Sequence, residues 1–168
     1  MDWFDSDYYH ILYKHRDYNE ARNFIDNIIK YLNIKKGSKI LDLACGIGRH
    51  SIYLEKIGFK VVGTDKSLNN INKAKANQNQ SLSFLQMEMI EDTNNRYDGI
   101  FNLFTSFGYV NHDYNLKTIK NIERQLKDDG IIVVDFMNTL FVKNNLVIEE
   151  TKVIDDLIFK IKRSSDGK

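Results

Sequence analysis

The sequence predicts an α/β fold built on a doubly wound, mostly parallel sheet with helices on both faces. Short apolar runs typical of buried strands alternate with segments whose apolar residues recur at helical spacing. The first strand, which contains Asp42, runs directly into Gly46 and Gly48. About twenty positions later the second strand ends in Asp65, as in nucleoside-binding sites on parallel sheets.

The first helix begins after Asp17, which we expect to be its N-cap, with Glu20 reaching back as in a capping box. An apolar stripe follows at helical spacing and predicts a face that packs on the core. Its members are Ala21, Phe24, Ile25, Ile28, Ile29 and Leu32. Residues 39–43 then form the first strand.

The helix that follows the glycines ends at Gly58, a good C-cap. Residues 59–64 form the second strand, and Ser67 caps a polar helix that extends to about Gln78. The strand-helix alternation predicts right-handed crossovers between parallel strands.

Residues 82–86 and 97–103 form the third and fourth strands. The next helix has apolar positions up to Leu126 and ends at Asp129–Gly130. Residues 131–136 are continuously apolar, which predicts a fifth strand buried on both faces.

Helical spacing is lost over residues 146–163, which indicates antiparallel strands. We expect strands at 146–148 with 153–154, and at 157–163, followed by a hairpin turn at 164–167. An exposed last strand pairs readily with another strand, so a homodimer formed through it is one expected assembly.

The composition excludes several classes of protein. Lys and Arg number 24 against 23 Asp and Glu, without a long basic run, so nothing in the chain favours nucleic acid. Cys45 is the single cysteine, which rules out an internal disulfide and is expected to be a small apolar filler. Without a signal peptide or a membrane-spanning run, we expect one cytoplasmic domain with no membrane partner.

The run Asp-x-Ala-Cys-Gly-x-Gly-Arg-His, which begins at Asp42, resembles motif I of the class I S-adenosylmethionine-dependent methyltransferases. The resemblance covers residues 1 to about 140. It implies a Rossmann-like sheet of order 3-2-1-4-5 with an N-terminal helical lid over 1–33, a cofactor-binding core over 34–139 and a β extension over 140–168. Complete members of the class add two further strands, so we expect this chain to be the front part of a longer protein, or a partner to complete its sheet.

The resemblance implies S-adenosylmethionine as cofactor, S-adenosylhomocysteine as product, and no metal. Asp65 would bind the ribose, the Gly46–Gly48 loop would pass the methionine part, and Glu88 with the Met89 backbone would meet the adenine. The alternative for Glu88 is a solvated loop charge, with Met87 or Met89 as core filler. The full set of expected cofactor residues is Asp42, Ala44, Gly46, Gly48, Asp65, Lys66, Glu88, Met89 and Asn102.

After strand four the run Thr-Ser-Phe-Gly-Tyr resembles a loop of a bacterial group of small methyltransferases. Phe104, Phe107 and Tyr109 would form an aromatic loop over the reaction face, and aromatic rings suit the methyl group of a sulfonium. We interpret Phe107 and Tyr109 as site residues and Phe101 as core.

The segment over residues 8–17 is dense in polar groups. In the same bacterial group such a segment folds over the cofactor, so Tyr9, Tyr13, His15 and Arg16 are candidates to touch cofactor or substrate. Arg16 is a candidate partner of the cofactor carboxylate. An amphipathic helix with inward tyrosines and solvated charges is an equally open interpretation.

The expected reaction transfers a methyl group to a small-molecule acceptor by in-line displacement, in which the protein mainly aligns the reactants. A base is needed only if the acceptor loses a proton, and His15, His112 and Tyr109 are the candidates. No spacing singles one out.

Several alternatives stay open. They are a methyltransferase acting on RNA or protein, a non-catalytic S-adenosylmethionine-binding module, and a nicotinamide-dependent oxidoreductase, which Ser51 and Asp42 disfavour. The absence of proline excludes the Asp/Asn-Pro-Pro-aromatic loop of amino-group methyltransferases of adenine and cytosine. The single cysteine argues against pyrimidine C5 enzymes, which need a separate nucleophilic cysteine.

Overall fold

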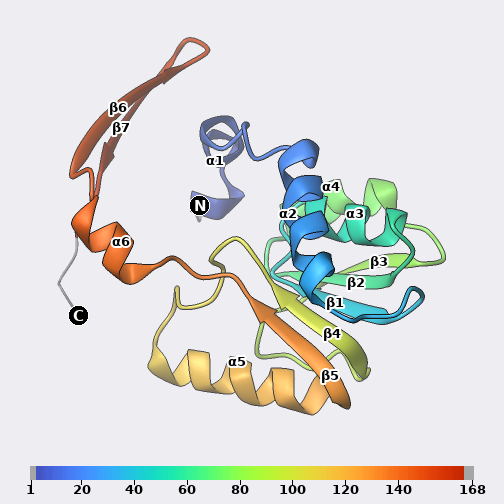
Figure 1. Cartoon of the computed structure of the whole chain (residues 1–168). Coiled ribbons are helices and arrows are strands. Elements are labelled where there is room, and N and C mark those ends of the chain that lie inside the picture. Colours follow the sequence, from blue (N-terminus) through green and yellow to red (C-terminus); the bar gives the residue numbers. More distant parts are fainter. Residues whose placement is uncertain (1–2, 165–168) are drawn as a thin grey trace. The chain divides into compact units, whose positions relative to one another are not determined.

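The structure is a computed structural model that describes residues 3–164 (Figure 1). The chain divides into two compact units. The larger unit consists of residues 15–136, and the smaller one of the described parts of residues 1–14 and 137–168. Each unit is described by itself below.

A five-stranded parallel sheet forms the larger unit, in the order β3-β2-β1-β4-β5 (Figure 1). The predicted order is therefore confirmed. β1 lies at the centre, and the order reverses between β1 and β4, which is where open α/β sheets bind ligands. The strands are β1 (Lys39–Leu43), β2 (Lys60–Asp65), β3 (Leu82–Gln86), β4 (Tyr97–Asn102) and β5 (Leu126–Val134).

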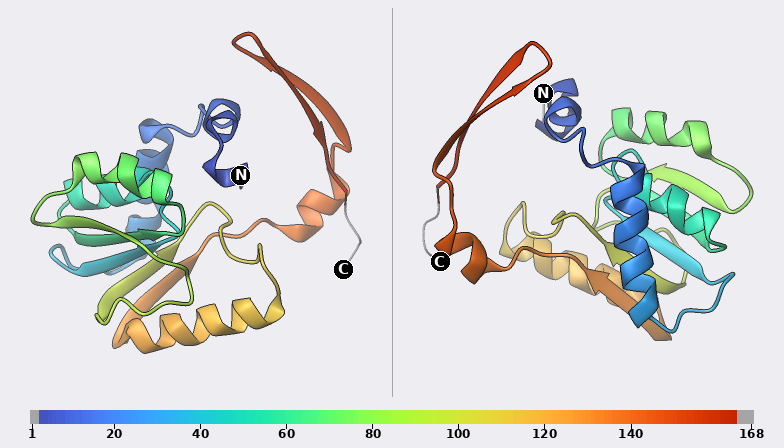
Figure 2. Two further views of the ribbon diagram at one scale, coloured as in Figure 1. Left: turned by 180° about the vertical axis from the view of Figure 1, so that it is seen from behind. Right: turned by 45° about the horizontal axis from the view of Figure 1, so that its top comes forward.

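Helices cover both faces of this sheet, as predicted (Figures 1 and 2). On one face lie α2 (Tyr18–Tyr31), α3 (Arg49–Lys56) and α4 (Leu68–Ala74), whose last turn continues as a 3-10 helix, η2 (Lys75–Asn77). On the other face lies α5 (His112–Gln125), which buries Ile122 against the sheet.

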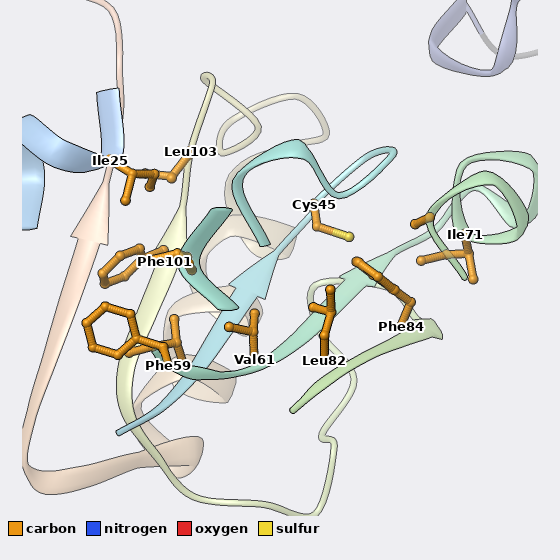
Figure 3. Packing of buried hydrophobic residues seen from close by; sticks show 12 residues of the cluster. Ile25, Cys45, Phe59, Val61, Ile71, Leu82, Phe84, Phe101 and Leu103 are labelled. Atoms are coloured by element: carbon orange, nitrogen blue, oxygen red, sulfur yellow. The ribbon is translucent and has the colours of Figure 1, made fainter. Parts of the chain in front are cut away.

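The core on the three-helix face is a single apolar cluster (Figure 3). It joins Ile25 of α2 and Ile71 of α4 to strand residues such as Phe84 and Phe101. Phe101 is fully buried, which confirms its assignment to the core. Cys45 lies in the same cluster as a buried thiol, so its prediction as an apolar filler is also confirmed.

The predicted capping box at the start of α2 is half right. The Asp17 side chain caps the helix by accepting hydrogen bonds from the N–H groups of Asn19 and Glu20, both at 2.9 Å. Glu20 does not reach back to the backbone. Its carboxylate instead binds the side chains of Arg16 and Arg49, because two guanidinium groups compete for it.

The boundary between α5 and β5 differs from the prediction. α5 ends at Gln125, and Leu126 already pairs with Tyr97 in the sheet. An irregularity in the β4–β5 register then absorbs residues 127–130 before Ile131 pairs with Gly99. Leu126 fits the helical spacing of apolar residues in the sequence, but in the structure it is the first residue of β5.

The expectation that the fifth strand is buried on both faces is wrong. β5 is the edge of the described sheet, and Ile132 and Val134 are 42% and 39% exposed. Phe136, just after the strand, is also exposed. A run of apolar residues predicts a strand, but it does not distinguish a central strand from an edge strand.

The smaller unit contains η1 (Trp3–Asp5), α1 (Asp7–Leu12), α6 (Thr139–Asn144) and an antiparallel hairpin of β6 (Glu149–Ile154) and β7 (Leu157–Lys162). The hairpin turns at Asp155, which has a φ of 52°. Antiparallel strands were predicted correctly, but α6 was not foreseen and residues 146–148 lie outside β6. The predicted turn at 164–167 lies outside the described residues apart from Ser164.

β7 pairs along one edge with β6, so the last predicted strand has a partner within its own chain. A homodimer through its other edge stays a prediction. Among the helices that the structure describes, none combines the length and the apolar character that crossing a membrane requires.

We predict that Gly63→Ala destabilises the fold by about 1–3 kcal/mol, because an added Cβ overpacks the core. That atom would lie 2.7 Å from the Phe84 ring and 2.9 Å from Cys45 Sγ. Urea denaturation measures the loss. The double variant Gly63→Ala, Phe84→Leu should recover part of it, and a Gly63→Ala protein as stable as the parent would contradict the packing.

Candidate functional site

The loop after β1 depends on left-handed backbone. Ala44, Gly46 and Gly48 have φ values of 63°, 58° and 80°. Glycine is required at 48, because a Cβ there would lie 2.6 Å from the Phe84 ring. A Cβ at Gly46 would meet nothing within 4 Å, so space is open beside this backbone.

Asp65, the last residue of β2, ties this loop to the second strand. Its carboxylate accepts hydrogen bonds from the N–H of Gly46 at 2.8 Å and from the N–H of Ser67 at 2.9 Å. Each carboxylate oxygen has a second lone-pair site. The expected ribose-binding residue and the expected glycine loop are therefore one connected group.

Asp42 is buried in β1 behind the loop. Its carboxyl accepts a 2.5 Å hydrogen bond from the Ser51 hydroxyl. Burial raises the pKa of Asp42 to about 6, although the Ser51 hydrogen bond and the charge of Arg49 oppose the rise. The nearby charge of Asp65 adds to it. Asp42 therefore changes charge near neutral pH.

The loop after β3 carries Glu88 and Met89 and is held by α5. The Tyr114 hydroxyl donates to the Glu88 carboxylate at 2.7 Å, and the Asn121 amide donates to the Met89 carbonyl at 2.9 Å. Burial, and then the hydrogen bond to Glu88, raise the pKa of Tyr114. The Glu88 side chain is exposed, but the hydrogen bond from Tyr114 fixes its orientation. Met89 packs on the core of the α5 face.

Asn102 ends β4 and links the two central strands. Its side-chain amide N–H donates to the backbone carbonyl of Leu43 at 2.8 Å. The backbone carbonyl of Asn102 accepts from the Asp135 N–H at 2.9 Å. The side chain is fully buried, and its Oδ1 has no hydrogen-bond partner among the described residues. A buried acceptor without a donor is unusual and suits a ligand donor.

The aromatic loop that follows β4 is strained. Phe104 and Thr105 both have left-handed φ values, 60° and 55°, which non-glycine residues rarely adopt. The Phe104 N–H is held by the Asp135 carboxylate at 2.9 Å. Phe107 is half-buried, whereas Tyr109 is 60% exposed.

A cluster of charged side chains lies beside this loop, and of its members only Arg16 was predicted as a site residue. Arg49, buried at the start of α3, binds Glu20, which also accepts from Arg16 at 2.8 Å. Burial raises the pKa of Glu20, but the hydrogen bonds and charges of Arg49 and Arg16 outweigh it and lower the pKa overall. Arg16 and Glu20 are four residues apart, but Arg16 precedes the N-cap Asp17 and is not part of α2. Nothing in the sequence indicated that Arg49 binds Glu20.

His50 follows Arg49 and is buried too, with its ring centre 5.8 Å from that of Phe24. Burial and, to a smaller extent, the charge of Arg49 lower the pKa of His50 to about 3, although the charge of Glu20 opposes the shift. The imidazole is therefore neutral at physiological pH.

The remaining candidates are divided between the two units. Tyr9 and Tyr13 pack on each other in the smaller unit, with ring centres 4.9 Å apart. His15 and His112 are exposed, and His112 is the first residue of α5. Lys66 is also exposed beside Asp65. The roles of these residues, including the catalytic base, stay predictions.

No group of three or more His, Cys, Asp or Glu side chains within residues 3–164 is arranged to hold a metal ion. The candidate site is a set of backbone and side-chain groups at the carboxyl ends of β1, β2, β3 and β4.

Comparisons with known proteins agree with this geometry. A family model described as a methyltransferase domain matches residues 34–163. The putative methyltransferase YqeM of Bacillus subtilis is 32% identical over 132 residues, which cover 76% of this chain and 51% of that protein. A glycine/sarcosine N-methyltransferase of Halorhodospira halochloris is 30% identical over 127 residues, covering 71% and 47%.

A solved structure of a TehB-like SAM-dependent methyltransferase from Corynebacterium glutamicum superposes with a TM-score of 0.61 at 27% identity, covering 79% of this chain and 73% of that one. An S-adenosylmethionine-dependent methyltransferase from Clostridium acetobutylicum has the same fold, with a TM-score of 0.73 at 22% identity, covering 95% and 68%.

The chain spans about half the length of the curated relatives it matches. The family model nevertheless covers most of it, and the glycine loop, the acidic end of β2 and the sheet order all lie in the matched region. The chain therefore belongs to the class I S-adenosylmethionine-dependent methyltransferase family.

Proposed function

We propose that this chain binds S-adenosylmethionine at the carboxyl ends of its central strands and transfers the methyl group to a small-molecule acceptor. The hydrogen bond from the Gly46 N–H to the Asp65 carboxylate carries the proposal. The bond connects two groups. One is a glycine backbone that a ligand can approach closely, and the other is a carboxylate that can accept hydrogen bonds from a vicinal diol.

The described residues fit such a ligand. Space is open beside Gly46, where the loop would receive the amino-acid tail. The buried Oδ1 of Asn102 is an acceptor suited to an ammonium group. Glu88 and the Met89 backbone, held by α5, offer hydrogen-bonding groups for an adenine.

When bound, S-adenosylmethionine supplies a methyl group already activated on a sulfonium. The chain then has to align acceptor, methyl and sulfur, which can account for about 7–11 kcal/mol of the barrier. Phe107 and Tyr109, on the strained loop after β4, are the proposed contacts beside the methyl group. His15, His112 and Tyr109 are the candidate bases if the acceptor must lose a proton.

Similarity to glycine/sarcosine N-methyltransferases over about two thirds of the chain supports a small acceptor with an amino group. The direct test supplies S-adenosylmethionine with glycine, sarcosine, RNA or protein and measures S-adenosylhomocysteine. Turnover with a small amine supports the proposal. Saturable binding of S-adenosylmethionine without product in any mixture or in cell extract would instead identify a binding module.

We predict that Asp65→Asn weakens the binding of S-adenosylhomocysteine by roughly 10- to 100-fold, since hydrogen bonds to a charged group contribute about 1.5–3 kcal/mol. Calorimetric titration measures the affinity. The control is Asp98→Asn, at the opposite end of the sheet, where Asp98 pairs with Lys127. Unchanged affinity in the Asp65 variant would refute the placement of the ribose.

We also predict that Asp42→Asn stabilises the ligand-free protein at pH 8. The pKa of Asp42 rises to about 6 on folding. Its favourable contribution to the free energy of unfolding is therefore complete below the unfolded-state pKa of about 3.9 and is lost as pH rises through 6. Removing the ionisable group avoids this loss, worth about 3 kcal/mol at pH 8.

Urea denaturation of both proteins between pH 4 and pH 8 checks this prediction. The difference in unfolding free energy should grow from pH 4 to pH 7 in favour of the variant and then level off. A difference that is constant with pH would show that Asp42 keeps an ordinary pKa.

A further inference from the structure

The Tyr114 hydroxyl contacts the loop that we expect to meet the adenine. Tyr114 lies in the first turn of α5, where its N–H donates to the N-cap Asn111 at 2.9 Å. Its hydroxyl donates to Oε2 of Glu88 at 2.7 Å. Burial and the hydrogen bond to Glu88 raise the pKa of Tyr114, and a backbone hydrogen bond from Met89 opposes the rise. One hydroxyl therefore meets both residues expected to bind the base, and all of them belong to the larger unit.

The backbone of this loop is held by other hydrogen bonds. The Glu88 N–H donates to the Glu91 carboxylate at 2.6 Å, and the Glu91 N–H donates to the Glu88 carbonyl at 3.0 Å. The Asn121 amide donates to the carbonyls of Met89 and Glu91 at 2.9 and 2.8 Å. The Tyr114 hydroxyl is thus an added contact rather than the one that shapes the loop.

A hydroxyl and an adenine can offer these groups the same hydrogen bonds. An ionised carboxylate such as that of Glu88 only accepts, and the Met89 N–H only donates. The Tyr114 hydroxyl matches them with one donor and one acceptor. Adenine has the same pair in its amino group and a neighbouring ring nitrogen. Because the Met89 N–H has a single proton, the hydroxyl and the base compete for it.

Tyr114 can release these groups without moving the helix. The Asn111 side chain holds its N–H, and the Thr118 hydroxyl donates to its carbonyl at 2.9 Å. Its side chain is only half-buried, and the preceding residues His112 and Asp113 are exposed. Rotation about the side-chain torsions of Tyr114 therefore moves the hydroxyl while the backbone of α5 stays in place.

We propose that the Tyr114 hydroxyl occupies the adenine-binding groups of the ligand-free chain and has to leave them when the cofactor binds. The inference rests on the proposed function, in which Glu88 and the Met89 backbone meet the adenine. Tyr114 is then an internal competitor. The apparent affinity for the cofactor equals the intrinsic affinity reduced by the fraction of chains in which Tyr114 has left Glu88 and Met89.

Calorimetry with S-adenosylhomocysteine tests the competition on the parent chain, Tyr114→Phe and the control Tyr53→Phe. Tyr114→Phe removes the hydroxyl and keeps the ring. We expect it to bind roughly 2- to 10-fold more tightly, the range that corresponds to one hydrogen bond. The Tyr53 hydroxyl of α3 also donates to a carboxylate, that of Asp26 on α2, at 2.7 Å. The control is expected to bind as the parent does.

NMR of the parent chain follows the hydroxyl itself. Tyrosine isotopically labelled at Cζ reports the hydrogen bonding of each hydroxyl, and the two variants identify the signals of Tyr114 and Tyr53 by their loss. Saturation with S-adenosylhomocysteine is expected to move the Tyr114 signal toward that of a solvent-exposed tyrosine and to leave the Tyr53 signal in place.

The inference is overturned if Tyr114→Phe binds S-adenosylhomocysteine no more tightly than the parent, or if the Tyr114 signal keeps its position in the saturated parent. Weaker binding by Tyr114→Phe would show instead that Tyr114 stays in place and positions Glu88 for the base. A parent chain that does not bind S-adenosylhomocysteine at all would refute the proposed function, and with it the premise of the competition.

Discussion

The hydrogen bond between the Gly46 N–H and the Asp65 carboxylate organises the candidate site. β1 and β2 are parallel, and Leu43 pairs with Thr64, so the last residue of β2 lies level with the loop after β1. The carboxylate then fixes that loop and the start of the next one through Ser67. Because these bonds exist within the chain itself, the groups that would meet a nucleoside are oriented in advance, which lowers the ordering cost of binding.

The first turn of α3 departs from ordinary helix packing. Arg49, His50 and Ser51 are consecutive polar residues, and all are buried. Buried polar groups destabilise a fold unless they are paired. Ser51 is paired with Asp42 and Arg49 with Glu20, while His50 stays neutral against Phe24. A turn made of apolar residues would pack with less difficulty, so this arrangement is typical of a region shaped by binding.

The two strand predictions that need correction share one cause. The apolar run over residues 131–136 indicated a strand enclosed by the sheet, and residues 146–148 indicated a strand of the hairpin. In the structure β5 is an edge with exposed side chains, and the hairpin begins at Glu149. Local hydrophobicity predicts that a segment can be extended, but pairing partners decide where a strand begins and how much of it is covered.

The sequence by itself determined the parallel α/β class, the glycine loop and the acidic end of β2, because periodicity, glycine and turn signals are local properties of the chain. The sheet order followed only from the resemblance to a known family. The sequence also marked Asp42, Glu88 and Asn102 as residues at strand ends. Only the tertiary structure decided that Ser51 binds Asp42, that Tyr114 orients Glu88 and that Arg49 meets Arg16 on Phe104. These contacts join residues of different elements, and strand register and helix packing determine the partners rather than spacing in the sequence.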